Sequence, residues 1–461
     1  MSLLKHYMIL LTLGWEGVFS QRRTLNRAVE HALAMPCVMG RRTVSRTICA
    51  LGRQQRDWSA DYRIFSRSKW DPERLFDPVV RECLQRFPQL CGPVCIALDD
   101  TALKKTGKKI PGAFWQYDHM SPPFHKNLMF GQRYIQASFL LPHYLEGDFP
   151  ARSYPVRFTD APVVKKPGKR ASEEQRLQYR KQKKKVNLSL QAVAVIGSLR
   201  RSLDEAGAEA RTMLAATDGS YCNRNVYTAQ MERTDLVSRC RKDARLCLEA
   251  PATDSRRFYA KEKFTPESVR LDPKVPWKKI TVHFAGKPRR IKYKEVRDVL
   301  WQGGAKRRKL RLIVIAPQPY RNSKKSRLQF REPAYLLSTD LHSPARLLVQ
   351  TYLDRWQIEV NHRDEKDTLG VGQAQVWSSH SVHRHPAFAV ASYSLLLLAS
   401  LRAFGPGRSS EFAALPLWRK KGNRPSLLDI LTLLRAEINE RPSSLPISDQ
   451  IRENMVAYAY T

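Results

Sequence analysis

Two aspartates follow short apolar runs of the kind that form buried β-strands. Asp99 comes directly after "VCIAL", and Asp218 comes directly after "MLAAT". A carboxylate at the end of a buried strand lies at the rim of its sheet, where carboxylates from neighbouring strands can converge and share cations. Each aspartate taken alone has a commoner use, as a turn residue or a helix N-cap.

A third acid lies in the probable helix "YLDRWQIEVNHRDEKDTLG", which covers residues 352–370. At about 100° per residue, one arc of about 60° on this helix holds four polar or amphipathic side chains, Tyr352, Arg355, Glu359 and Lys366. Such a stripe predicts a helix face that lines a polar site. The alternative is a solvated face, on which Arg355 and Glu359, four residues apart, form an ordinary salt bridge.

Acids that converge in a strongly basic protein predict a metal site. The chain has 80 Lys and Arg residues against 43 Asp and Glu residues, a formal net charge of +37. Carboxylates a few ångströms apart repel each other unless a cation lies between them, and hard oxygen ligands suit Mg²⁺ or Mn²⁺. Two such ions about 3.5 to 4 Å apart clamp the attacking and leaving oxygens of an in-line phosphoryl displacement. Glu359 would then be a metal ligand, and Arg355 and Lys366 would face phosphates.

The charge also narrows the class of partner. An excess of positive charge spread over most of the 461 residues favours a polyanion, with nucleic acid first and an anionic membrane surface second. The apolar run at residues 8–19 is shorter than the roughly 20 residues a bilayer span needs, and no small-residue cleavage site follows it. We therefore expect a cytosolic or nucleoid protein with no membrane partner. A ribosome-type RNA-binding protein would explain the charge, but it gives no reason for the ordered acids.

The eight cysteines show neither a CxxC pair nor zinc-knuckle spacing. A chain of this length needs no disulfide to stabilise its core. We expect free, buried thiols.

The elements that must position the acids can be read from hydrophobic periodicity. Residues 1–88 predict short basic helices, each behind a Thr or Ser that could cap it, and these could form a DNA-binding helix-turn-helix or a plain helical bundle. Strands are predicted at 93–100, 133–142 and 211–217, and a long amphipathic helix at 186–207. Residues 163–185 hold ten basic residues, and they predict either a solvated linker or a segment that follows a phosphate backbone.

The predicted secondary structure changes twice in the later part of the chain. Residues from about 243 to 345 predict hairpins, with two strands about a Gly-Lys-Pro turn at 286–288, a buried strand "LRLIVIA" and another in "AYLLS". Helical periodicity returns at 344, again at 385–404, and once more at 426–438 in a Pro-rich tail.

The spacing of the four stripe residues resembles a known signature. Tyr, two residues, Arg, three residues, Glu, six residues and Lys is similar to the YREK signature of DDE transposases from bacterial insertion sequences, the group that includes elements moving through hairpin-ended intermediates. "IALDDTALKKTGK" and "ATDGSYCN" resemble the strands that carry the first and second Asp of that group. "LVSRCRKDARL" and "VWSSHSVHRH" are similar to segments that follow the second Asp and the Glu. The resemblance covers about residues 90 to 405.

The resemblance implies an α/β chain with an RNase H-like catalytic core, a mixed five-stranded sheet flanked by helices. Asp99, Asp218 and Glu359 would be its catalytic, metal-binding triad, and Tyr352 would join Arg355 and Lys366 in binding DNA. The implied layout has five parts: a helical DNA-binding domain at 1–88, the first part of the core at 89–242, a β-rich insertion at 243–343, the Glu-bearing helix of the core at 344–405, and a C-terminal helical tail at 406–461.

The implied function is a bacterial, cytoplasmic, nucleoid-associated transposase. It would cleave the terminal inverted repeats of double-stranded DNA with two Mg²⁺ or Mn²⁺ ions and join the freed 3′-hydroxyl to target DNA, as a homodimer in a synaptic complex. The alternative is a catalytically silent, domesticated DNA-binding or regulatory protein.

Two points within the resemblance stay open. Alternate strand residues point to opposite faces, so only one of Asp99 and Asp100 should reach the metals, and we prefer Asp99, which closes the apolar run and shares a face with Thr101. In some members of the group an insertion-domain tryptophan stacks on a flipped base. Trp277 and Trp301 lie in the corresponding region, where we expect both to be core residues.

Overall fold

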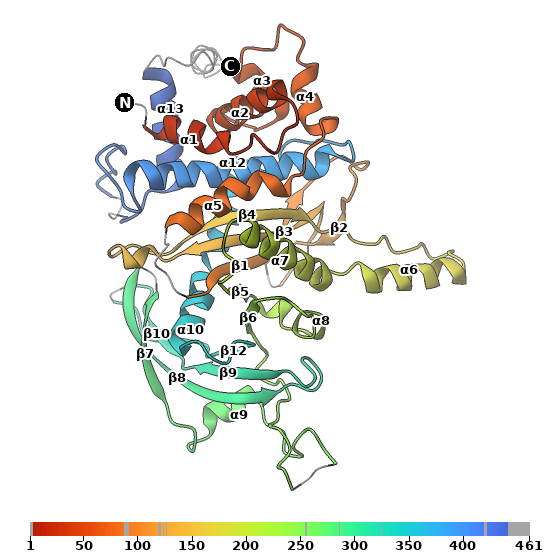
Figure 1. Cartoon of the computed structure of the whole chain (residues 1–461), viewed down its shortest axis with the longest axis vertical. Helices are drawn as coiled ribbons and strands as arrows, with labels where there is room; N and C mark the ends of the chain where they lie inside the picture. Colours follow the sequence, from red (N-terminus) through yellow and green to blue (C-terminus); the bar gives the residue numbers. More distant parts are fainter. Residues whose placement is uncertain are drawn as a thin grey trace.

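The structure is a computed structural model, and it describes residues 3–86, 92–118, 121–122, 124–125, 127–253, 256–284, 286–323, 325–418 and 422–440. A large sheet occupies the middle of the molecule, and the long helix α12 (Ser381–Phe404) runs between this sheet and a layer of N-terminal helices (Figure 1). One apolar cluster joins these layers, because the α12 side chains pack on both sides. The fold is therefore of the mixed α/β class, as expected.

The N-terminal part is helical, as its periodicity predicts. Its elements are α1 (Leu3–Leu13), α2 (Arg22–Cys37), α3 (Val44–Ala50), α4 (Ser59–Ser66), η1 (Glu73–Phe76) and α5 (Asp77–Arg86). Thr43 caps α3, since its hydroxyl accepts a hydrogen bond from the Arg46 N–H at 3.2 Å. The expected Thr or Ser cap is wrong for α2, which begins after Gln21 without a side-chain cap. These helices pack directly on α12, where the rings of Trp15 and Phe388 lie 5.4 Å apart.

Strands at the centre of the sheet have the order β4-β3-β1-β5-β6. Their bounds are β1 (Val94–Lys104), β3 (Leu128–Leu141), β4 (Arg152–Asp160), β5 (Met213–Thr217) and β6 (Thr234–Arg239), with the short β2 (Phe114–Tyr117) also paired to β3. β1 runs antiparallel to β3 and parallel to β5, which is parallel to β6. The helix α7 (Leu188–Glu205) connects β4 to β5. This mixed five-stranded order is consistent with an RNase H-like core.

The segment predicted to be β-rich is β-rich. It holds α9 (Pro266–Leu271), β7 (Lys278–Phe284), β8 (Lys287–Leu300), β9 (Lys309–Ile315), β10 (Gln318–Tyr320), β11 (Gln329–Arg331) and β12 (Ala334–Ser338). It does not form a sheet apart from the core, because β12 pairs antiparallel with β6 and continues the central sheet. Within the described residues, ten strands belong to this one sheet.

The stretch expected to be one helix from 344 to 370 is divided. It forms α10 (Ala345–Asp354), α11 (Gln357–Arg363) and a π-helical turn at Asp364–Thr368. At the first junction Glu359 N–H bonds the Trp356 carbonyl at 3.1 Å, three residues back, and this tightens the turn. The π turn then widens the helix, so the angular positions calculated for a regular α-helix do not hold through Lys366.

The basic segment at 163–185 is more ordered than a linker. It contains α6 (Glu173–Lys185), which projects from the body of the molecule (Figure 1). Ser172 and Gln175 form a capping box, in which each side chain bonds the other residue's backbone N–H. The sequence "SEEQ" carries the signal of a capping box, which the expectations for residues 163–185 did not include.

The apolar helix α12 is long enough to cross a membrane by length and composition. Its most apolar window is 83% buried inside the structure, as in the central helix of a packed core. The predicted C-terminal helix is also present as α13 (Leu427–Glu440). The seven cysteines that lie in the described residues are all free, as predicted, and Cys91 lies outside those residues. The predicted burial holds for Cys37, Cys83, Cys240 and Cys247 and is wrong for the half-buried Cys49, Cys95 and Cys222.

Candidate active site

The two predicted aspartates lie level with each other on neighbouring parallel strands. Leu98 of β1 pairs with Thr217, the last residue of β5, so the next residues along each strand are Asp99 and Asp218. The expectation that Asp99 ends its strand is wrong, because β1 stays paired with β3 as far as Lys104. Beyond Leu98, however, β1 has no strand on its β5 side, and this leaves an open sheet edge beside both carboxylates.

Asp99 and Asp100 point to opposite faces of the sheet, as the two-residue period of a strand requires. On the Asp99 face, Cys95 and Ala97 pack with Ile358 of α11. The Asp100 carboxylate instead accepts a hydrogen bond from the Tyr221 hydroxyl at 3.0 Å. It also lies 3.7 Å from the Arg133 Nε. Asp99 is therefore the aspartate of this pair that shares a face with the α10–α11 segment.

Arg355 connects Asp99 with Glu359. Its Nη1 lies 3.6 Å from the Asp99 Oδ2, and its Nη2 donates to the Glu359 Oε1 at 3.3 Å. The salt bridge expected four residues apart on a helix thus forms, but not on a solvated face, since Arg355 is only 9% exposed. Its Nε and Nη1 are buried without a hydrogen-bond partner among the described residues. The guanidinium lies between two carboxylates and keeps N–H groups to spare.

The Asp218 charge acts on the other two acids. Burial raises the pKa of Asp99 to about 6, His362 and Arg355 lower it, and the Asp218 charge raises it. Burial also raises the pKa of Glu359, Arg355 and His362 lower it, and the Asp218 charge again raises it. The direct contacts of Arg355 join only Asp99 and Glu359, and Asp218 acts on both through its charge.

Asp218 also has the structural role considered for it from the sequence. It is the N-cap of η3 (Gly219–Tyr221), and its Oδ1 accepts hydrogen bonds from the Ser220 N–H at 2.9 Å and the Ser220 hydroxyl at 2.6 Å. These bonds occupy one carboxylate oxygen. The cap fixes the direction of the side chain at the sheet edge, so the two roles are compatible.

A groove of about 710 Å³ runs along the part of β1 beyond Leu98, and of the three predicted acids Glu359 lines it. Its lining includes Asp100, Glu359, His362 and Lys366. Burial lowers the pKa of Lys366, while nearby carboxylates, Asp99 among them, raise it. The Tyr352 ring lies under the Arg355 guanidinium at 5.8 Å. Glu359 and Lys366 therefore line the groove, whereas Tyr352 and Arg355 do not.

Sequence reasoning missed three further polar groups of this site. His362 follows Glu359 by three residues, a spacing that places both on one helix face, and this signal was available. Arg133 and Tyr221 hold Asp100 from β3 and η3. No local pattern marks them, because their approach to Asp100 depends on the pairing of distant segments.

The carboxylates of this site suit hard divalent cations, but they lie too far apart to enclose one. Buried carboxylates with raised pKa values gain most from a nearby cation, and oxygen ligands are those that Mg²⁺ and Mn²⁺ prefer. Among the described residues, no three His, Cys, Asp or Glu side chains are already close enough to enclose an ion. Arg355 provides the positive charge between Asp99 and Glu359 in this arrangement.

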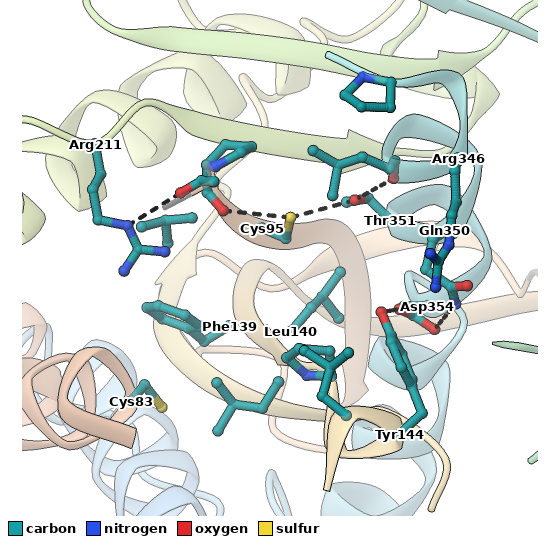
Figure 2. A pocket seen from close by; sticks show the side chains of 18 residues that line it. Cys83, Cys95, Phe139, Leu140, Tyr144, Arg211, Arg346, Gln350, Thr351 and Asp354 are labelled. Carbon is teal, nitrogen blue, oxygen red and sulfur yellow. Dashed lines mark hydrogen bonds between the residues drawn. The ribbon is translucent and has the colours of Figure 1, made fainter. Parts of the chain in front are cut away.

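A second cavity of about 310 Å³ lies at the start of β1 and beneath α10, and Asp99, Asp218 and Glu359 do not line it (Figure 2). Its walls are mostly apolar. The Asp354 carboxylate accepts from the Gln350 Nε2 at 2.9 Å and the Tyr144 hydroxyl at 3.3 Å, and burial raises its pKa to about 7. Burial therefore makes this acid easier to protonate than an ordinary aspartate.

The two insertion tryptophans differ. Trp301 is partly buried against the main core and meets Tyr227 edge-on at 5.9 Å, as expected of a core residue. The same expectation is wrong for Trp277, which is 39% exposed and carries the Lys294 Nζ at 4.9 Å from its ring. An exposed edge location explains this, because Trp277 directly precedes β7, the last strand of the sheet.

Comparison with known families gives one match. The family described as DDE superfamily endonuclease matches residues 17–308, more than half of the chain. The matched region contains Asp99 and Asp218 and ends before Glu359. No curated protein matches the chain closely enough to count as a relative.

Proposed function

Because the chain belongs to the DDE superfamily endonucleases, we propose that it is a transposase that cleaves the ends of a mobile DNA element and joins the freed 3′-hydroxyl to target DNA. The family makes it a nuclease-type enzyme with DNA as its substrate. The YREK spacing of Tyr352, Arg355, Glu359 and Lys366 supports the narrower assignment to a transposase of a bacterial insertion sequence.

One observation carries the proposal: three acids from distant parts of the chain share an electrostatic environment at an open sheet edge. Asp99 and Asp218 lie level on parallel strands, and Arg355 connects Asp99 with Glu359 of α11. The Asp218 charge raises the pKa of both other carboxylates. A fold gains nothing from such repulsion, so the cluster is better explained by function than by stability.

In this proposal Asp99, Asp218 and Glu359 hold two Mg²⁺ or Mn²⁺ ions, whose chemistry is to activate water or a 3′-hydroxyl and to stabilise the leaving oxygen of a phosphodiester. Arg355 offers its unpaired N–H groups to a phosphate and keeps the carboxylates ionised. Lys366 contacts the strand from the groove, and the Tyr352 ring supports the Arg355 guanidinium. Tyr221 and Arg133 hold the Asp100 carboxylate on the face of β1 opposite to Asp99.

Activity on DNA tests the proposal. Purified full-length protein should convert a supercoiled plasmid carrying the DNA that flanks its gene into nicked and linear forms with Mg²⁺ or Mn²⁺. Chelation of the metal by EDTA should abolish this conversion, because the carboxylates alone cannot activate water at neutral pH. Failure to nick with either ion would contradict the proposal and favour the silent, domesticated DNA-binding alternative.

We propose the oligomeric state, the domain roles and the location from the same function. Two element ends must be cut together, so we propose a homodimer in the synaptic complex. The helices of residues 1–88 are proposed to bind the terminal inverted repeats, with residues 89–242 and 344–405 as the catalytic core, 243–343 as its insertion and 406–461 as a helical tail. We also propose that the protein acts in the bacterial cytoplasm, on the nucleoid.

A further inference from the structure

We infer that the basic arm at residues 162–187 binds the phosphate backbone of the DNA duplex beside the cleaved bond. This inference rests on the proposed function, and it names a surface that extends the substrate contact beyond the groove. The arm consists of a basic loop that leads out from the end of β4 and of α6, which leads back to the start of α7. Figure 1 shows α6 standing clear of the helices and the sheet.

Packing does not explain why α6 is a helix. Every residue from Glu173 to Lys185 is exposed except Tyr179, which is half-buried. An isolated helix of 13 residues is marginal in water, and most helices in proteins depend on a buried face. The capping box at Ser172 stabilises only the first turn. The exposed length of about 20 Å is therefore available to a partner.

Four basic residues of α6 form one stripe. Arg176, Arg180, Lys183 and Lys184 follow the spacing i, i+4, i+7 and i+8, which places them within about 100° on one face of α6. The other side carries Gln175, Gln178 and Gln182 together with Lys181 and Lys185, so the helix is basic on both sides and most densely along the stripe. Like charges three or four residues apart repel each other, so the basic stripe costs stability in the free protein. A row of phosphates would offset this cost.

The base of the arm is fixed next to the acidic cluster. The Gln191 Nε2 donates to the Pro162 carbonyl at 3.0 Å, so the two ends of the arm meet. At the start of α7, Ser189 accepts a hydrogen bond from the Asn223 Nδ2 at 2.9 Å. The same Asn223 amide donates to the Ser220 carbonyl at 2.8 Å, in the turn that Asp218 caps. Duplex DNA with its scissile phosphate at Asp218 therefore passes the point from which the arm extends.

The occupant is a nucleic-acid backbone because the surface is densely charged and its exposed apolar side chains, Val163, Leu177 and Val186, are far outnumbered by basic ones. Residues 163–185 contain ten basic and two acidic side chains. Protein interfaces are centred on buried aromatic or aliphatic groups, and they are depleted of lysine. Phosphate contacts use lysine and arginine and release counterions, so they can be counted from the salt dependence of binding.

The test replaces the stripe and measures the salt dependence. The variant Arg180→Gln, Lys183→Gln, Lys184→Gln keeps Arg176, whose Nη2 bonds the Lys169 carbonyl at 2.8 Å and holds the loop on the helix. Binding of the full-length protein to a fluorescein-labelled duplex of arbitrary sequence is followed by anisotropy at several salt concentrations. We expect the slope of log K against log salt to fall by about 2 to 3, because each lost phosphate contact removes about 0.9.

Two controls separate charge at the arm from other effects. The variant Gln178→Ala, Gln182→Ala replaces two uncharged side chains of α6 and leaves the charge of the helix unchanged. Its slope of log K against log salt should equal that of the wild type. The variant Lys261→Gln, Lys274→Gln, Lys279→Gln removes an equal charge from exposed positions in the β-rich segment, and it should lower the slope less than the arm variant does. An unchanged slope in the arm variant, or an equal fall in the second control, would overturn the inference.

Cleavage separates failure of the inference from failure of the proposed function. At saturating protein, the arm variant should nick DNA with the wild-type rate, because none of its three changed side chains lies in the groove. Normal nicking with an unchanged salt slope would reject the arm and leave the endonuclease intact. A reduced slope in a protein that never nicks DNA would support the arm and reject the enzyme.

Discussion

Glu359→Gln should reduce metal-dependent DNA cleavage by more than about 10³-fold, which corresponds to a loss of at least about 4 kcal/mol of transition-state stabilisation. Glutamine has the size of glutamate and retains an oxygen for the Arg355 Nη2, now 3.3 Å from the Glu359 Oε1. It lacks the negative charge that a divalent ion requires. The rate of plasmid nicking in Mg²⁺ and in Mn²⁺ measures the effect.

Binding must survive this substitution if Glu359 acts in the chemical step. The affinity of the Glu359→Gln protein for duplex DNA should equal or exceed that of the wild type, since a negative charge has left the groove. Glu249→Gln is a matched control, because Glu249 pairs with Lys309 at 3.1 Å on the surface and away from the groove. Nicking by Glu359→Gln at the rate of this control would remove Glu359 from the active site.

Asp99→Asn and Asp100→Asn should differ strongly although the residues are adjacent. We expect the first to reduce cleavage by more than about 10³-fold and the second by no more than about 10-fold. Asp99 shares a face with Arg355 and is level with Asp218, whereas Asp100 bonds the Tyr221 hydroxyl on the other face, a bond that asparagine can still accept. The measurement is single-turnover nicking by both proteins at saturating concentration.

The reverse order of activities would identify Asp100 as the first acid of the triad. This outcome is physically reasonable, because Asp100 and Glu359 line the same groove. Thermal unfolding of both variants serves as the control for folding. Asp100→Asn is expected to lose some stability, since it gives up the charge that faces Arg133 at 3.7 Å.

Local patterns in the sequence predicted most individual elements. The apolar run before Asp218 forms β5, the hairpin texture of 243–345 forms β7, β8, β9 and β12, and the apolar stretch at 385–404 lies within α12. The alternation along β1 correctly predicted that Asp99 and Asp100 lie on opposite faces. These features depend on side chains within a few residues of each other, which is the range that periodicity reports.

Features that depend on distant partners could not be read in this way. The extension of β1 past Asp99 follows from its pairing with β3, and the fusion of the β-rich segment to the core follows from the pairing of β12 with β6. The junction between α10 and α11 depends on three-residue hydrogen bonds at Trp356, an otherwise acceptable helix residue. The burial of Arg355 between two carboxylates required the sheet and the helix to be placed together.

The capping box of α6 is a different case, since its signal is local. Ser172 followed by Gln175 predicts a helix start, but the density of charge led to two other expectations, a solvated linker or a segment that follows a phosphate backbone. Neither expectation included a helix.

Anomalous diffraction from crystals soaked in Mn²⁺ tests most directly whether Asp99, Asp218 and Glu359 form one metal site. We predict anomalous peaks within coordination distance of all three carboxylates, with the Arg355 guanidinium displaced from between Asp99 and Glu359. Crystals of the Glu359→Gln protein should show no peak at this place. Manganese bound only elsewhere in a protein that nicks DNA in Mn²⁺ would contradict the assignment of these three residues.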